Sequence, residues 1–257
     1  MNRPPFSLLR YACYALLLTT ASARADWVRR DSQSEPAATA SVTHEHIVLT
    51  DETSGTDATL DLASFSPKTC RLRIVDNPDG RDLSEAMRAG NWIAGVNGGY
   101  FTEDFTPLGL RIDNRKSVSP LVRGKLMSGV ISASGPLVWI MRLNEFPKNS
   151  RPDVAIQCGP FLIDRGHVVP GLNGTKPARR TFVATTASEV LLGFSSSVSL
   201  AQLSSILASP SAELKIQRAL NLDGGSSSAF WFKRQNGSVF SISGQKAVRD
   251  FLAIAPR

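Results

Sequence analysis

The chain has 257 residues, of which 42% are hydrophobic, and it carries a formal net charge of +7. This length and apolar content suffice for one sizeable core, so we expect a single domain. The basic residues are scattered, with no dense Lys/Arg block and no interleaved aromatic residues, which argues against a nucleic-acid-binding protein. A mildly basic surface suits anionic substrates such as phosphodiesters or acidic glycans, although it is also an ordinary solvated surface.

Residues 1–25 have the three parts of a secretory signal peptide. A basic start with Arg3 and Arg10 precedes the apolar stretch 11–20, and two overlapping small-x-small patterns lie within residues 21–25. The apolar stretch is too short for a convincing membrane span. We therefore expect cleavage after residue 25, export to the periplasm or beyond, and no stable membrane insertion afterwards. Cleavage removes three arginines and lowers the net charge from +7 to +4.

The elements that follow predict a single α+β domain. Residues 26–43 are small and polar and indicate a flexible lead-in to a domain at 44–257. A helix at 82–90 should end at Gly90 as a left-handed cap, and a helix at 199–208 should begin at Ser199 and bury one apolar face. Short strands are predicted at 46–50, 58–62, 71–75, 92–97, 108–112, 129–132, 137–140, 154–158, 161–163, 181–186, 190–194, 219–222, 229–233, 238–242 and 251–254. This pattern favours a large, mainly antiparallel, strongly bent β-sheet packed with a few helices.

The cysteines and histidines suggest no metal site and no cofactor. Cys70 and Cys158 remain after signal cleavage and are compatible with either a disulfide or two buried free thiols. His44 and His46 lack further ligands at a suitable spacing, so we expect them on the surface of a strand.

Two apolar stretches end in a polar residue followed by two glycines. In the first, Asn97 precedes Gly98 and Gly99. Asn-Gly is a common hairpin turn, so this segment alone has a structural explanation. Its repetition later in the chain predicts that two strand ends face one cleft.

The second stretch carries Asn221 and Asp223 on alternate positions, so both side chains leave the strand on the same face. Gly224 and Gly225 follow, and then a run of serines that begins with Ser226. Amides with so little side-chain cover can form a concave nest for an anion. Asp-Gly is equally a common hairpin turn.

Four segments together resemble the phosphodiester glycosidase family. They occur in the family's order within a region from about residue 44 to the C-terminus, and the short bacterial members are most similar. Cys158 lies where the family usually has a small residue, which favours free thiols. The segments are Val96-Asn97-Gly98-Gly99-Tyr100-Phe101, Gln157-Cys158-Gly159-Pro160-Phe161-Leu162-Ile163, Arg179-Arg180-Thr181 and Asn221-Leu222-Asp223-Gly224-Gly225-Ser226-Ser227.

The resemblance implies a hydrolase that releases a sugar from a phosphodiester. Arg180 is expected to clamp the phosphate, because its planar fork matches two phosphate oxygens, and Asp223 to act as general acid/base or to position water. Asn221 and Asn97 would orient the sugar or the oxyanion. Arg179 should face the opposite way, towards solvent. The matching motifs imply that substrate is bound by Gly98, Gly99, Tyr100, Gln157, Thr181, Gly224, Gly225 and Ser226.

Two questions stay open at the level of sequence. The motifs contain no second carboxylate of the usual glycosidase pair, so either the C–O or the P–O bond could break. A non-catalytic protein that binds a glycan or a cell-envelope polymer could use the same cleft, with Trp92, Tyr100 and Trp231 stacking on sugar rings. The sequence assigns neither the sugar and aglycone nor an oligomeric state.

Overall fold

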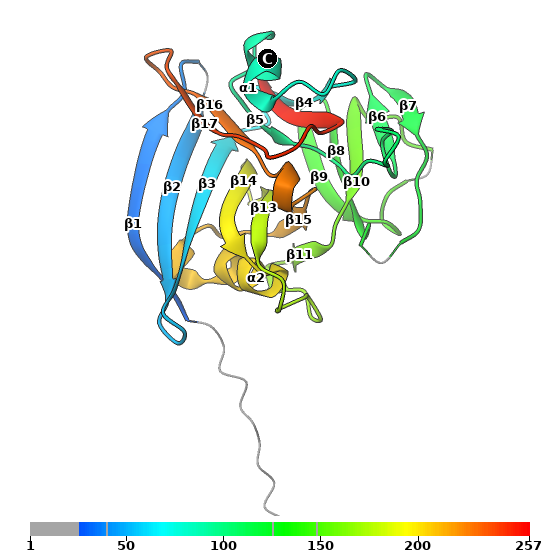
Figure 1. Ribbon diagram of the computed structural model, residues 1–257. Helices are drawn as coiled ribbons and strands as arrows, with labels where there is room; N and C mark the ends of the chain where they lie inside the picture. Colours follow the sequence, from blue (N-terminus) through cyan, green and yellow to red (C-terminus); the bar gives the residue numbers. More distant parts are fainter. Residues whose placement is uncertain (1–25, 40, 125, 148) are drawn as a thin grey trace, which may run out of the picture.

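The computed structural model describes residues 26–257 except 40, 125 and 148, so the expected signal peptide lies outside the described residues. Strands hold 48% of the chain and helices 9%, which makes the fold mostly β with few helices. The strand pairings of the described residues are antiparallel, as predicted. The strands form three sheets, however, where the sequence suggested one (Figure 1).

The first sheet has eight strands in the order β1-β2-β3-β14-β13-β15-β11-β12. It carries residues of three of the four motifs on neighbouring strands, because β15 pairs with both β13 and β11. Its strands are β1 (Trp27–Pro36), β2 (Val42–Asp51), β3 (Thr56–Phe65), β11 (Phe161–Asp164), β12 (His167–Val168), β13 (Ala178–Thr185), β14 (Val190–Val198) and β15 (Arg218–Asn221).

The prediction of a flexible lead-in at residues 26–43 is wrong. Trp27–Pro36 forms the edge strand β1, which pairs along most of its length with β2. Trp27 is buried at 1% exposure, but most of the strand's other side chains are polar and face solvent. An edge strand is held by backbone hydrogen bonds to one neighbour, so it needs no apolar alternation that a sequence pattern would reveal.

The other two sheets have five strands each, in the orders β7-β6-β10-β8-β9 and β17-β16-β5-β18-β4. In Figure 1 the former makes the right-hand lobe and the latter lies across the top. The strands are β4 (Cys70–Asp76), β5 (Ala94–Asn97), β6 (Arg111–Asp113), β7 (Lys116–Ser119), β8 (Gly129–Ser134), β9 (Leu137–Arg142), β10 (Val154–Cys158), β16 (Phe230–Lys233), β17 (Val239–Ile242) and β18 (Asp250–Pro256).

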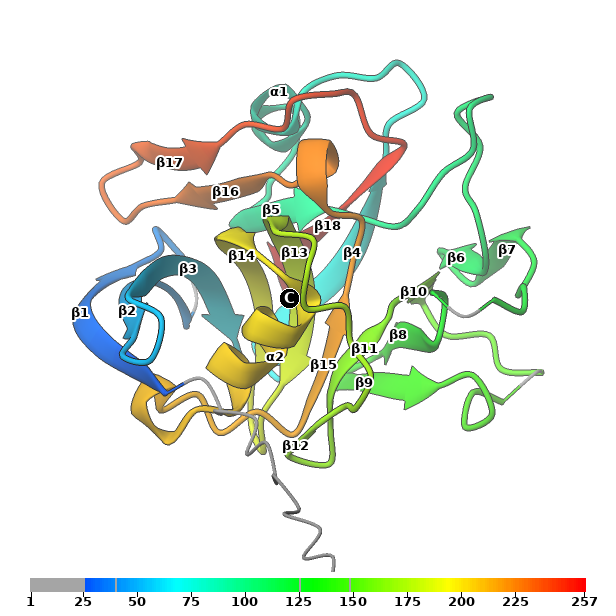
Figure 2. The same cartoon turned by 60° about the horizontal axis from the view of Figure 1, so that its bottom comes forward.

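Two α-helices occur in the described part of the chain. α2 (Leu200–Ala208) begins with a complete capping box between Ser199 and Gln202, as the Ser199 cap predicted, and packs on the first sheet (Figure 2). α1 (Leu83–Arg88) lies against β5 and β16. Neither helix has the length and hydropathy that crossing a bilayer would require.

The expected left-handed cap at Gly90 is also wrong. α1 ends at Ala89 in the right-handed helical region, and Gly90 does not have a positive φ. A Cβ at position 90 would lie 2.2 Å from Nε1 of Trp92. The glycine therefore makes room for the indole ring.

The expectation for the two cysteines is confirmed, and the expectation for His44 is wrong. Cys70 and Cys158 are buried free thiols, which confirms the favoured alternative. His44 is buried at 3% exposure, not on the surface: its ring nitrogens lie 2.8 Å from Glu35 Oε1 and 3.0 Å from Asp61 Oδ1. Strand β2 has one face inside the fold, and two carboxylates compensate the polarity of this ring there.

Candidate functional site

The two polar-Gly-Gly segments meet where the first and third sheets adjoin. β5 ends at Asn97, whose side-chain nitrogen donates to the carbonyl of Asp223 at 2.6 Å. The amide of Asp223 in turn donates to the carbonyl of Gly98 at 3.2 Å. The chain leaves β15 through this contact and enters β16. The predicted convergence of Asn97 and Asp223 is therefore present in the fold.

Asn97 is a brace at the centre of this junction. It is fully buried, and its Oδ1 accepts from Thr181 Oγ1 at 2.6 Å and from the amide of Ala229 at 3.1 Å. With the bond to Asp223, one side chain joins β5, β13 and both sides of the η2 turn (Gly225–Ser227). The predicted orienting amide of Asn97 thus acts on the protein's own backbone.

Asp223 is a titratable group at this junction. Burial raises the pKa of its carboxyl, while the hydroxyl of Ser227, which donates to Oδ2, and the ammonium of Lys246 partly oppose this shift. Gly225 adopts φ +66°, and a Cβ there would meet nothing within 4 Å. The space on the side of Gly225 where a Cβ would stand is therefore free.

Arg180 lies beside the same turn. Its Nε donates to the carbonyl of Val198 at 3.0 Å and its Nη2 to the carbonyl of Lys176 at 2.6 Å. Nη1 lies on the side of Gly224, 3.6 Å from where a Cβ on that glycine would stand. Nε and Nη2 thus hold the guanidinium in place, and Nη1 faces Gly224.

Arg179 differs from its prediction. It is half-buried, and its Nη2 donates to the carbonyls of Ser228 at 2.7 Å and Ser243 at 3.0 Å. A bulge in the pairing of β13 with β14, between residues 178 and 180, breaks the strict alternation of faces on which the prediction of a solvent-facing Arg179 relied. Arg179 therefore ties the serine segment to the loop after β17.

Tyr100 and Asn221 converge on one carbonyl. The hydroxyl of Tyr100 donates to Gly159 O at 2.6 Å, and Nδ2 of Asn221 donates to the same oxygen at 3.1 Å. Burial raises the pKa of Tyr100, so its hydroxyl stays protonated. Oδ1 of Asn221 is buried and has no hydrogen-bond partner among the described residues. A buried acceptor without a donor lowers the stability of the folded protein until a donor reaches it.

Gln157 supports the loop that follows Tyr100. Its Oε1 accepts from the amides of Leu110 and Val122, both at 3.0 Å, and its Nε2 donates to the carbonyls of Val122 and Met127. All of these partners are backbone groups of the segment that follows Tyr100. The side chain predicted to bind substrate is thus engaged with the protein itself.

Asp250 is a site residue that the motifs do not reveal. Its Oδ1 accepts from the amide of Gly99 at 2.9 Å and its carbonyl from the amide of Gly98 at 2.9 Å. A Cβ on Gly98 would stand 2.0 Å from Oδ1 of Asp250, so this glycine makes room for a carboxylate of the protein, whereas a Cβ on Gly99 would stand 2.9 Å from Cγ2 of Ile156. Burial raises the pKa of Asp250, against the effect of Arg111, whose Nη1 lies 3.3 Å from Oδ2.

Two of the three aromatic residues that the binding-protein alternative requires for stacking on sugar rings are not free to do so. Trp231 is only 2% exposed and packs with α1 in a core cluster, and Trp92 packs against the same cluster. Neither ring is placed as an open stacking surface for a sugar. Of the three residues in that hypothesis, Tyr100 is the one that reaches the site.

The sequence model of the phosphodiester glycosidase family matches residues 90–255. The chain belongs to this family. The match includes Asn97, Arg180 and Asp223, together with Lys246 and Asp250, which the motif comparison did not single out.

Among related proteins, this member of the family is 27% identical to the uncharacterized protein YigE of Escherichia coli (strain K12) over 143 residues. The aligned part is 49% of this chain and 56% of YigE, so little more than half of that relative is matched.

Two solved structures share the fold. A hypothetical protein from Synechocystis superposes with a TM-score of 0.64 at 16% identity, over 84% of this chain and 62% of that one. The catalytic domain of zebrafish N-acetylglucosamine-1-phosphodiester alpha-N-acetylglucosaminidase, auto-inhibited by a pro-peptide, gives 0.62 at 16% identity over 88% of each chain. At this identity the likeness establishes the fold of the family member and not its substrate.

Proposed function

We propose that this chain is an exported hydrolase that cleaves a sugar-1-phosphodiester and releases the sugar from its phosphate. Family membership supports hydrolysis by a phosphodiester glycosidase. The observation that carries the proposal is that Asp223, a carboxyl whose pKa is raised by burial, directly precedes Gly224, and that Nη1 of Arg180 lies on the side of that same glycine. Cleavage of a phosphodiester requires an acid for the leaving oxygen and a cation for the phosphate, and both kinds of group are present beside Gly224.

Each residue has a defined part in this reaction. Nη1 of Arg180 binds a phosphate oxygen, while its other two nitrogen contacts keep the guanidinium from turning away. Asp223, in its acid form, gives a proton to the oxygen that leaves as the bond breaks. Water adds to the other fragment, and the proton that the water loses restores the acid. A sugar hydroxyl would supply the donor that Oδ1 of Asn221 lacks.

The remaining predicted residues act on the site through the backbone. Thr181 and Asn97 hold the carbonyl of Asp223 in position, and Gly98 and Gly99 receive Asp250. The open conformation of Gly225 would let the diester approach the main chain.

The proposal is tested with a panel of sugar-1-phosphodiesters, including N-acetylglucosamine-1-phosphodiesters. We expect turnover of at least one diester, and little or none of the matching sugar-1-phosphate or of a simple glycoside, because Arg180 and Asp223 need both the charge and a leaving ester. Hydrolysis in ¹⁸O-labelled water then assigns the bond: label in the sugar indicates C–O cleavage, and label in the phosphate indicates P–O cleavage. Tight binding of a diester or glycan without turnover would instead support the binding-protein alternative.

Export has its own test. We expect the mature chain to begin near Asp26, and intact-mass measurement of protein from the native compartment should show the loss of about 23–25 residues, the ordinary length of a signal peptide. Full-length protein retained in the cytoplasm would contradict this part of the proposal and leave the hydrolase assignment untouched.

A further inference from the structure

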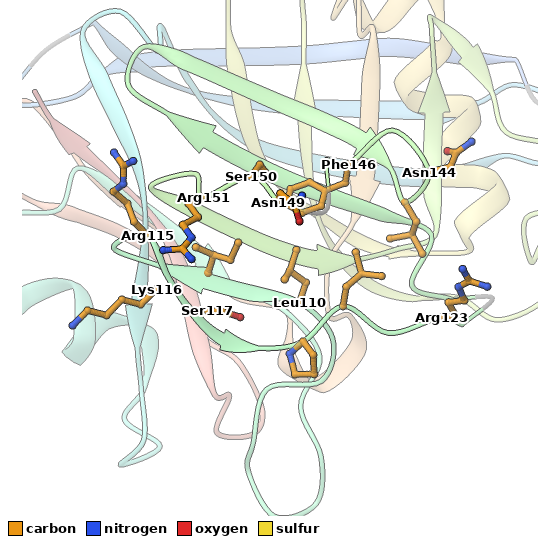
Figure 3. A pocket seen from close by; sticks show the side chains of 14 residues that line it. Leu110, Arg115, Lys116, Ser117, Arg123, Asn144, Phe146, Asn149, Ser150 and Arg151 are labelled. Carbon is orange, nitrogen blue, oxygen red and sulfur yellow. The ribbon is translucent and has the colours of Figure 1, made fainter.

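A groove with a volume of about 1370 Å³ lies between the β6–β7 hairpin, the loop after β7 and the β9–β10 connection (Figure 3). None of the candidate site residues lines it. The volume exceeds the roughly 300–1,000 Å³ of most small-molecule pockets. The apolar side chains of Leu110, Ile112 and Phe146 contribute to its lining. The groove therefore has room and apolar surface for more than one sugar ring.

Every charged residue that lines this groove is basic. Arg115, Lys116 and Arg151 lie towards one end and Arg123 towards the other, with Leu110 and Phe146 between them (Figure 3). All four cations are exposed, and within the described ranges none of them forms an ion pair. Unpaired charges of one sign at both ends of a hollow attract an anionic ligand.

The position of Arg115 is conformationally unfavourable for an arginine. Asn114 and Arg115 are the two residues between β6 and β7, and their φ angles are +48° and +65°. Two-residue hairpin loops of this kind strongly prefer Asn-Gly, because glycine adopts the second left-handed conformation without steric cost. The chain places a guanidinium at this end of the groove where glycine would suit the turn better.

Three exposed aliphatic side chains, which we call the rim, lie on the segment of chain that borders the groove. Leu121, which lines it, is 37% exposed, and Val118 and Leu126 on the same segment of chain are 50% and 63% exposed. Phe146 is the one aromatic residue among those lining the groove, and it is 6% exposed. Sugars and bases are usually bound by open aromatic faces, whereas exposed aliphatic side chains beside basic ones are typical of interfacial membrane binding.

We propose that this groove and its rim bind the surface of a membrane that contains anionic phospholipid. The four cations contact phosphate headgroups, and the exposed aliphatic side chains of Val118, Leu121 and Leu126 enter the boundary between headgroups and acyl chains. The protein thereby attaches to the lipid surface as a peripheral protein. This function is separate from the proposed hydrolysis and does not depend on it.

The test is co-sedimentation of the purified protein with vesicles. Vesicles of phosphatidylcholine with about 30 mol % phosphatidylglycerol should bind it, and pure phosphatidylcholine vesicles should bind it at least tenfold more weakly. Binding should weaken when salt rises from about 0.1 M to about 0.5 M, because exposed charges are then screened. Equal binding to both vesicle types would overturn the proposal.

Variants locate the surface. The Arg115→Gly/Arg151→Ala pair should lower the partition coefficient about 20–30-fold, since each basic residue near a charged bilayer contributes about fivefold. Arg115→Gly suits the turn, so the fold should be retained. The matched control is Lys68→Ala/Lys233→Ala, which removes the same charge from two exposed positions that do not line the groove. The proposal is wrong if the groove pair binds like wild type, or if the control pair loses as much binding.

A second set of variants separates lipid from a soluble anion. Lys116→Ala/Arg123→Ala tests the same charge on other parts of the groove and stands in if the first pair is unstable by circular dichroism. Leu126→Ser keeps every cation but removes an exposed aliphatic side chain, so it should lower vesicle binding several-fold. If Leu126→Ser binds vesicles as wild type does, and polyglutamate binds the wild type as tightly as vesicles do, the groove takes an acidic polymer and the lipid assignment fails.

Discussion

Replacing Asp223 by asparagine should lower kcat on a hydrolysed diester by about 10²–10⁴, the usual range for loss of a positioned general acid or base. Asparagine keeps the size of the side chain and an oxygen to accept from Ser227, but it carries no transferable proton. Binding of the sugar product should survive, because Arg180, Tyr100 and Asn221 are unchanged. Steady-state kinetics on a diester identified in the panel, with product binding measured by calorimetry, tests both statements.

Asp104→Asn is the matched control for this change, because it removes an exposed carboxylate from a nearby loop and should leave the rate unaltered. Arg180→Lys should fail in a different way. It keeps a positive charge but loses the planar fork, so KM should rise and kcat should fall together. A folded Asp223→Asn protein that hydrolyses the diester at the wild-type rate would show that Asp223 only braces the turn.

The raised pKa of Asp223 also predicts the direction of its pH effects. The acid form persists above the ordinary range of an aspartate, and kcat should decline as pH rises through the raised value if Asp223 donates the proton. Because the folded protein holds this proton more tightly than the unfolded chain, ionisation of Asp223 costs stability as pH rises through the same window. Asp223→Asn should remove both effects, and unfolding by urea at several pH values measures the second.

The parts of the fold that could be predicted from the sequence depend on local interactions. The helix from Leu200 was predictable because its capping box and apolar face lie within ten residues of one another. The division into three sheets was not, because it depends on pairings such as those of β15 with β13 and β11. Strand β1 escaped prediction for a related reason, since its neighbour supplies the hydrogen bonds and its own sequence shows no apolar period.

The residues of the site likewise fall into those that the local sequence reveals and those that it does not. Asn97 and Asp223 could be placed together because each follows a strand and precedes two glycines. Asp250 could not, because it bonds to Gly99 across 151 positions and sits outside any recognisable motif. The pair Gly98-Gly99 was itself the available signal, because two glycines at the end of a buried strand indicate close approach of some other group. The sequence suggested substrate as that group, and the structure shows the carboxylate of Asp250 at Gly98 and the side chain of Ile156 at Gly99.

Arg111→Met should lower the free energy of unfolding by about 3–5 kcal/mol, which is typical when one partner of a buried ion pair is removed. Asp250 is 2% exposed and Arg111 is equally buried, so the carboxylate would lose its main compensating charge. Arg30→Met is the matched control: Arg30 pairs with Glu52 at 3.0 Å, the two side chains are 49% and 51% exposed, and its loss should cost less than about 1 kcal/mol. Urea unfolding monitored by circular dichroism gives both values.

The charge of Asp250 is what makes the loss of Arg111 costly, and two further measurements can isolate it. In the double variant Arg111→Met/Asp250→Asn, the neutral amide still offers an oxygen to Gly99, so stability should return to within about 1–2 kcal/mol of wild type. Burial already raises the pKa of Asp250, and loss of Arg111 raises it further, so the deficit of the single variant should shrink as pH falls from about 7 to about 5 and the carboxyl takes up a proton. A deficit that is independent of pH and persists in the double variant would mean that Arg111 stabilises the fold through packing of its side chain. In that case Asp250 would hold Gly98 and Gly99, and through them Asn97, without help from a counter-charge.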